Sequence, residues 1–240
     1  MLYLIGLGLH DEKDVSVKAI EIAKKCACYC ELYTNKWYGS LEELGNMIGK
    51  KVQLLQRSDL EENLKQLINT AKETDVALFV PGDPLAATTH VEVVVQARKE
   101  GIPIEIIHNA SIFSAIAESG LQLYKFGKTA TIPFTKHLES VKEAVNSNKG
   151  MGLHTLLLLD LDSVNDKYMS VSEALELLMS SDILNEHDKV VAMAKLGSGE
   201  PEIFYDEAGP LHKKVFSVPA VLIVPGKLHF LEKDYLEMLK

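Results

Sequence analysis

The chain has 240 residues, of which 47% are hydrophobic and 25% are charged, and its formal net charge is −9. This length and composition allow a substantial buried core, in one large domain or two small ones. An acidic chain is a poor general binder of the phosphate backbone, which argues against broad nucleic-acid binding. Arginine occurs only at Arg57 and Arg98, so anionic ligand groups would have to rely on backbone N–H groups or lysines.

Three cysteines stand at alternate positions, Cys26, Cys28 and Cys30. On one face of a strand, such neighbours lie about 6–7 Å apart, which is wide for adjacent ligands of one zinc ion. We therefore predict buried structural thiols, no metal site, and a reducing compartment such as the cytoplasm. The apolar run at residues 1–9 is short and lacks a basic leader, so it predicts neither a membrane span nor a secretion signal.

The first half of the chain alternates between two hydrophobic patterns. Short apolar runs predict strands at 2–7, 26–33, 52–54, 76–80 and 102–107. Amphipathic patterns and capping residues predict helices at 14–25, from 40 onward, and at 59–73, 90–100 and 111–119. Strands that alternate with helices predict a mostly parallel sheet connected by right-handed crossovers.

The second half follows a different order. Strands are predicted at 129–134, 154–161, 190–196, 202–205 and 220–224, and helices at 136–148, 170–178 and 231–239. Because several strands follow one another directly, this half predicts a mixed sheet. We therefore expect two α/β domains, at residues 1–115 and 116–240.

A glycine motif follows the first predicted strand, with Gly6 and Gly8 separated by one residue. A dinucleotide-binding fingerprint needs a third glycine where Asp11 stands, so the chain fails that motif. The chain also lacks the P-loop pattern of nucleotide hydrolases. A tight turn and a ligand contact remain equally good interpretations of this glycine pair.

Rigid or donor-rich loops follow three other predicted strands. Residues 81–84 read Pro-Gly-Asp-Pro and place Asp83 on a stiff loop, although this is also ordinary turn chemistry. Ser111 opens a helix directly after a strand, as an N-cap or as a ligand contact. His229 follows the last strand, as a ligand contact or as a plain loop residue. Ligands of parallel α/β sheets bind beyond the carboxyl ends of the strands, so these loops could converge on one cleft.

Four segments of the sequence resemble the diphthine synthase family, a branch of the tetrapyrrole-methylase class. They are MLYLIGLGLHDEKDVSVKAIE at the start, VPGDPLAATTH at 80–90, HNASIFSAIAESGLQLYKFGKTATIPF at 108–134, and VPGKLHFLEKDYL at 224–236. The resemblance covers nearly the whole chain. It implies two α/β domains with S-adenosylmethionine bound in the cleft between them, and a homodimer.

The resemblance also implies a set of cofactor-binding residues. Carried over by position, they are Leu9, Asp83, Ala86, Ser111, Ile112, Leu161, Met193 and His229. The implied reaction is successive N-methylation of the aminocarboxypropyl-histidine of translation elongation factor 2, giving diphthine in diphthamide biosynthesis. No catalytic side chain, metal, membrane or nucleic-acid partner is expected. The alternatives are a corrinoid or porphyrin C-methyltransferase and a non-catalytic nucleotide-binding module.

Overall fold

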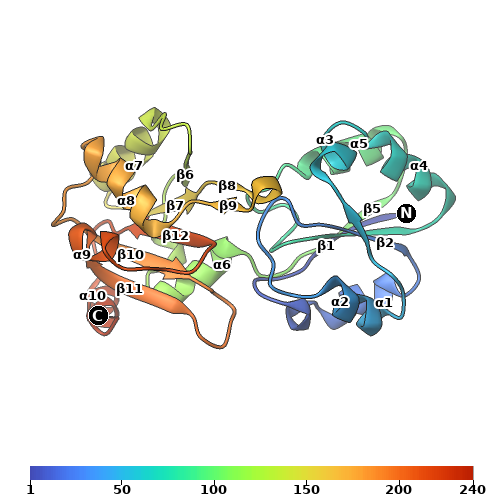
Figure 1. Ribbon diagram of the computed structural model, residues 1–240, viewed down its shortest axis with the longest axis horizontal. Coiled ribbons are helices and arrows are strands. Elements are labelled where there is room, and N and C mark those ends of the chain that lie inside the picture. The colour runs from blue at the N-terminus through green and yellow to red at the C-terminus, as the bar shows by residue number, and fades with distance from the viewer. Residues whose placement is uncertain (240) are drawn as a thin grey trace. The chain divides into compact units, whose positions relative to one another are not determined.

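The computed structural model describes residues 1–239, and the chain divides into two compact units, Met1–Phe113 and Ser114–Lys240 (Figure 1). Both units combine helices with a five-stranded sheet. Among the described residues, no helix combines the length and apolar character that a membrane crossing needs.

The first unit is built on a fully parallel sheet with the strand order β3-β2-β4-β1-β5. Its strands are β1 (Leu2–Gly6), β2 (Ala27–Glu31), β3 (Gln53–Leu55), β4 (Val76–Val80) and β5 (Ile104–Ile107). In the register of β4, β1 and β5, Leu4 lies beside Leu78 on one side and Ile106 on the other. These three neighbouring strands therefore end together, at the carboxyl edge of the sheet.

Helices cover both faces of this sheet (Figure 1). They are α1 (Val17–Ala23), α2 (Leu41–Ile48), α3 (Arg57–Glu61), α4 (Lys65–Glu73) and α5 (Val91–Lys99), with a 3-10 turn, η1 (Glu12–Asp14), before α1. Helices α1 and α2 bury one face together with Cys26, Cys28 and Cys30, while α3, α4 and α5 bury the other. The cysteines are buried and free, as predicted.

The long helix expected at 59–73 is instead two helices. Asn63 separates them, because both its backbone N–H (2.9 Å) and its side-chain amide (3.3 Å) donate to the carbonyl of Ser58. An asparagine that bonds the backbone in this way competes with the helical hydrogen-bond ladder. The break leaves Leu60 and Leu64 buried in the same core.

The second unit has a mixed sheet with the strand order β11-β10-β12-β7-β6. Its strands are β6 (Ala130–Ile132), β7 (Thr155–Leu159), β10 (Lys189–Ala194), β11 (Glu202–Glu207) and β12 (Ala220–Val224). Only the β6–β7 pairing is parallel. A small hairpin, β8 (Leu161–Asp162) and β9 (Lys167–Tyr168), follows β7 with the turn η4 (Ser163–Asn165) between its strands.

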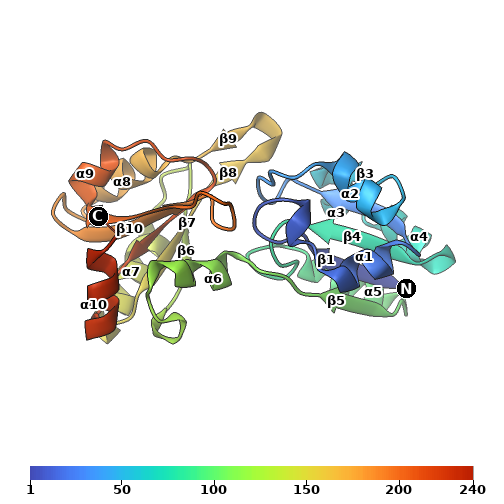
Figure 2. The ribbon, with the colours of Figure 1, turned by 90° about the horizontal axis from the view of Figure 1, so that it is seen from below.

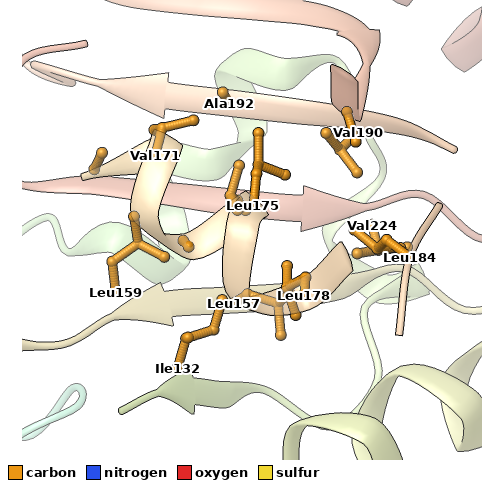
Figure 3. Packing of buried hydrophobic residues seen from close by; sticks show 14 of the residues in the cluster. Ile132, Leu157, Leu159, Val171, Leu175, Leu178, Leu184, Val190, Ala192 and Val224 are labelled. Carbon is orange, nitrogen blue, oxygen red and sulfur yellow. The ribbon is translucent and has the colours of Figure 1, made fainter. Parts of the chain in front are cut away.

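Helices α7 (Glu139–Met151), α8 (Val171–Ser180) and α9 (Ala208–His212) pack on one face of the second sheet. Figure 3 shows Leu175 and Leu178 of α8 directed at the strands that carry Leu157 and Ala192. The capping box predicted for this helix is present, with Ser170 and Glu173 bonding each other's backbone N–H groups. Helix α9 was not predicted, since its five residues include a glycine and a proline.

The opposite face of the second sheet carries α10 (Phe230–Glu237), which lies across the sheet from α8 and α9 (Figure 2). The short helix α6 (Ile112–Ala115) spans the boundary between the two units, and the 3-10 turns η2 (Ile116–Ser119) and η3 (Leu123–Lys125) follow in the second unit. The predicted helix at 111–119 is thus α-helical only in its first turn. It ends at Gly120, whose φ of +75° is the left-handed C-cap conformation.

Candidate active site

The loops after β1 and β4 are bonded to each other at the carboxyl edge of the first sheet. Gly8 and Gly82 form an antiparallel bridge, in which the Gly8 N–H donates to the Gly82 carbonyl at 3.2 Å and the Gly82 N–H donates to the Gly8 carbonyl at 2.9 Å. Both glycines are in the left-handed region, with φ of +86° and +69°. The bridge brings Leu9 and Asp83, the next residues along each loop, to the same edge of the sheet.

The loop after β5 joins the other two through Asn109. Its side-chain amide donates to the carbonyls of Gly6 (3.0 Å) and Asp14 (2.9 Å), 103 and 95 residues away in sequence. Gly6 leaves no space for a side chain here, because a Cβ would lie 2.5 Å from the Gly82 carbonyl and 2.7 Å from Cβ of Asn109. Residues 6, 82 and 109 are therefore packed backbone to backbone.

The carboxylate of Asp14 fixes the loop after β1. It accepts hydrogen bonds from the backbone N–H groups of Leu9 (3.0 Å) and His10 (2.7 Å). The amphipathic pattern predicts Asp14 at the start of a helix and gives no sign of this role. No sequence pattern marks it, because the contact depends on the loop turning back after Gly8.

Asp83 is nearly buried, with 12% of its side chain exposed, and it connects the β4 and β5 loops. Its Oδ2 lies 2.7 Å from Nδ1 of His108 and accepts from the Asn109 N–H at 3.2 Å. Its Oδ1 accepts from the Leu85 N–H at 3.0 Å. The carboxylate therefore holds two loops together, a role that the sequence did not reveal.

The remaining residues predicted in the first unit lie along the same loops. Ala86 is half-buried in the turn that Asp83 begins, and its N–H donates to the Asp83 carbonyl at 3.1 Å. Ser111 is 8% exposed, and a Cβ on Gly82 would approach it to 3.9 Å. Ile112 follows as the first residue of α6. The structure thus gathers Leu9, Asp83, Ala86, Ser111 and Ile112 at one edge of the first sheet.

Leu161 and Met193 lie toward one edge of the second sheet. β7 and β10 both run antiparallel to β12, which lies between them, and Leu158 and Met193 flank Val221 from either side. Leu161 begins β8, separated from the end of β7 by one residue, and is half-buried, whereas Met193 is fully buried.

His229 lies beyond the other end of β12. Since this strand runs opposite to β7 and β10, its carboxyl end lies at the edge where they begin. The exposed His229 caps α10, where its Nδ1 accepts from the Leu231 N–H at 3.3 Å. The structure therefore does not gather His229 with Leu161 and Met193.

A buried ionic network around Glu232 holds the amino end of α10. One oxygen accepts from Nε2 of His154 (3.1 Å) and the N–H of Gln122 (2.9 Å). The other accepts from the N–H of His229 (2.7 Å) and from the ammonium of Lys125. Burial by itself would raise the pKa of Glu232, but these hydrogen bonds outweigh it and lower the pKa to about 2.

The protonation state of His154 follows from its two partners. The Gly226 N–H donates to Nδ1 at 2.9 Å, so Nδ1 carries the lone pair and Nε2 carries the proton that faces Glu232. Burial lowers the pKa of this imidazole, against the opposing effect of Glu232. The ring is therefore neutral at neutral pH, and the network acts as a structural anchor.

The described residues contain no group of three His, Cys, Asp or Glu side chains arranged to hold a metal ion. The loops at the first sheet present backbone groups, the carboxylates of Asp14 and Asp83, and apolar side chains. Such a site can bind and orient a ligand that brings its own reactive group.

Comparison with known proteins defines the class. The family of Tetrapyrrole (Corrin/Porphyrin) Methylases matches residues 1–209. The match covers most of the chain, so this two-unit α/β protein, with a parallel sheet followed by a mixed one, belongs to that class of methyltransferases.

Full-length relatives narrow the assignment. The chain is 40% identical over 251 aligned residues to the diphthine synthase of Methanococcus aeolicus, covering 100% of this chain and 98% of that one. It is 40% identical over 253 residues to the diphthine synthase of Methanocaldococcus jannaschii, with the same coverage. A crystal structure of diphthine synthase matches with a TM-score of 0.93 and 40% identity, covering 99% of this chain and 95% of that one. The chain therefore belongs to the diphthine synthase family, and these findings do not favour a corrinoid methylase or a non-catalytic module.

Proposed function

We propose that this methyltransferase transfers methyl groups from S-adenosylmethionine to the amino group of the aminocarboxypropyl-histidine of translation elongation factor 2, successively, to give diphthine. The proposal rests on one observation: in this member of the diphthine synthase family, hydrogen bonds join the loops after β1, β4 and β5 at the carboxyl edge of the first sheet. Ligands of parallel sheets bind at this edge.

The residues at this edge suit such a cofactor. An ionised carboxylate offers about four acceptor positions. Asp83 uses three of them within the chain, which leaves one on Oδ1 for an ammonium or ribose hydroxyl. We propose that Asp83, Leu9, Ala86, Ser111 and Ile112 bind the cofactor. Leu161, Met193 and His229 stay predictions, and for His229 the helix cap supplies a structural reason for the residue.

When bound, the cofactor supplies a methyl group on a good sulfonium leaving group. The chain's contribution is then to hold the methyl carbon and the attacking amine close and in line, which lowers the barrier to an in-line displacement. Leu9 and Ala86 are half-buried apolar residues that a bound cofactor would cover, and the drier environment that results favours the neutral, nucleophilic amine. No general base is needed.

The decisive experiment mixes the protein, labelled S-adenosylmethionine and elongation factor 2 carrying the unmethylated intermediate. We expect label on the factor, and mass spectrometry should resolve the successive additions. A factor that lacks the aminocarboxypropyl group is the control and should take no label. Absence of transfer to the intermediate would overturn the proposal, and transfer to a corrinoid instead would favour the tetrapyrrole alternative.

We also propose a homodimer that works in the cytoplasm, as the family resemblance implies. The three thiols suit a reducing compartment, because they are buried and unpaired. Light scattering at micromolar concentration should give twice the monomer mass of 26.6 kDa.

A further inference from the structure

The loop that contains Asp83 and Ala86 ends at a buried histidine whose ring nitrogens have no hydrogen-bond partner. The side chain of His90 is 1% exposed, and it precedes α5 directly. Neither Nδ1 nor Nε2 makes a hydrogen bond. A neutral imidazole carries one N–H and one lone pair, and burying such a group unpaired is destabilising, because its hydrogen bonds to water are lost and not replaced. A leucine or phenylalanine would fill this space without that cost.

The polar group that faces His90 is an equally buried carboxylate. Glu31 stands at the carboxyl end of β2, and its Oε1 lies 3.6 Å from Nε2 of His90. Its side chain is fully buried and accepts from the N–H groups of Tyr33 (2.9 Å) and Thr34 (3.1 Å) and from the Thr34 hydroxyl. The carboxyl is therefore fixed in place, and the gap to His90 exceeds a hydrogen bond by less than 1 Å.

Protonation favours a neutral pairing of these groups. Burial raises the pKa of Glu31 to about 7, against the hydrogen bonds from Thr34 and Tyr33. Burial lowers the pKa of His90 to about 4, against the charge of Glu61. At neutral pH the imidazole is uncharged, and one hydrogen bond with Glu31 is possible whether the carboxyl or Nε2 provides the proton.

The loop between Asp83 and His90 has a strained position that needs support at both ends. Ala87 has a φ of +57°, a left-handed conformation that is strained for a residue with a Cβ, because the Cβ comes too close to the following carbonyl oxygen. The Thr88 hydroxyl donates to the Pro84 carbonyl at 2.7 Å and ties the loop internally. At the start of the loop, Asp83 is hydrogen-bonded to the β5 loop. At the end of the loop, His90 faces Glu31 and can bind the loop to β2.

We propose that Glu31 and His90 are positioning residues of the methyl-transfer site, which form a hydrogen bond when the 83–90 loop engages the cofactor. This rests on the proposed function. This hydrogen bond would fix the loop that carries Asp83 and Ala86 against the carboxyl end of β2. It acts through the loop, and neither side chain touches the reacting atoms.

Two variants at one position separate positioning from packing. His90→Phe fills the space with a ring that cannot hydrogen-bond, whereas the amide of His90→Gln reaches the position of Nε2 and can donate to Glu31. We expect calorimetry with S-adenosylhomocysteine to show about a tenfold weaker Kd for His90→Phe and a Kd within about threefold of wild type for His90→Gln. Tenfold corresponds to about 1.4 kcal/mol, the scale of one net hydrogen bond.

A packing role predicts the reverse order, with His90→Phe as stable and tight-binding as wild type and His90→Gln impaired in both respects. That result would overturn the inference, as would equal affinity for all three proteins. Glu100→Gln, at the exposed C-cap of α5, is the control and should bind as wild type. If the wild-type protein itself does not bind S-adenosylhomocysteine, the proposed function fails and the inference falls with it. Wild-type binding with an unaffected His90→Phe rejects the positioning role alone.

Discussion

His154 and Glu232 are 78 residues apart in sequence, and their side chains meet inside the second unit with Nε2 and Oε1 3.1 Å apart. One stands just before β7 and the other in the first turn of α10. Their contact ties the C-terminal helix to a central strand. The Glu232 carboxylate also accepts hydrogen bonds from Gln122 and Lys125, which hold the segment between these two residues against α10.

Replacement of Glu232 should destabilise the second unit. In Glu232→Gln the ammonium of Lys125, 20% exposed, loses its counter-charge, and breaking a buried pair of this kind costs about 3–5 kcal/mol. We expect a loss of about 3 kcal/mol in the free energy of unfolding, measured by urea denaturation and circular dichroism. Asp234→Asn, an exposed acid on the same helix, should change it by less than about 0.5 kcal/mol. A stable Glu232→Gln variant would show that the network contributes little.

The same network should make the free energy of unfolding depend on pH in the acidic range. The pKa of Glu232 is about 2 in the folded protein and 4.5 ordinarily, so its stabilisation is full above pH 4.5 and is lost as the pH falls toward 2. The pKa of His154 is lowered from 6.5, so its contribution also declines below pH 6.5. The 2.5-unit difference for Glu232 corresponds to about 3 kcal/mol. Urea denaturation across this range should show the loss, with a shallower slope in Glu232→Gln.

Asp83→Asn should weaken cofactor binding through the loops. The new amide would place a donor against the donors of Asn109, Leu85 or His108 and so separate the β4 and β5 loops. We expect the Kd for S-adenosylhomocysteine to rise at least tenfold by calorimetry. Asp75→Asn, just before the amino end of β4, is the matched control and should leave the Kd unchanged. An unaltered Kd in Asp83→Asn would remove this carboxylate from the site.

Gly6→Ala tests the close approach of the loops. Its Cβ would lie 2.5 Å from the Gly82 carbonyl, so the loops must separate, at a cost of about 1–3 kcal/mol in stability. Binding of S-adenosylhomocysteine should weaken by at least tenfold. Gly150→Ala is the control, because a Cβ there meets nothing within 4 Å and a helical alanine stabilises by up to about 1 kcal/mol. Normal binding by Gly6→Ala would contradict the described packing.

The sequence predicted the alternation of strands and helices in the first half because each pattern is local. β4 and β12 were predicted with their observed bounds, 76–80 and 220–224, since fully buried strands appear as uninterrupted apolar runs. The break at Asn63 and the short α9 were missed. Both depend on hydrogen bonds or packing that a periodicity cannot register.

The sequence by itself determined that loops with Gly8, Asp83 and Ser111 follow buried parallel strands, because the chemistry of a turn is written in its own residues. Only the tertiary structure decided that hydrogen bonds of Asp14 and Asn109 hold these loops together. It also decided that the Asp83 carboxylate accepts most of its hydrogen bonds from within the chain, and that His90 faces Glu31. It also placed His229 at the far end of β12, because strand direction is set by pairing with other strands. Hydrogen bonds such as those from Asn109 to Gly6 and Asp14, 103 and 95 positions apart, leave no periodic trace in sequence, so their partners emerge only when the sheet forms.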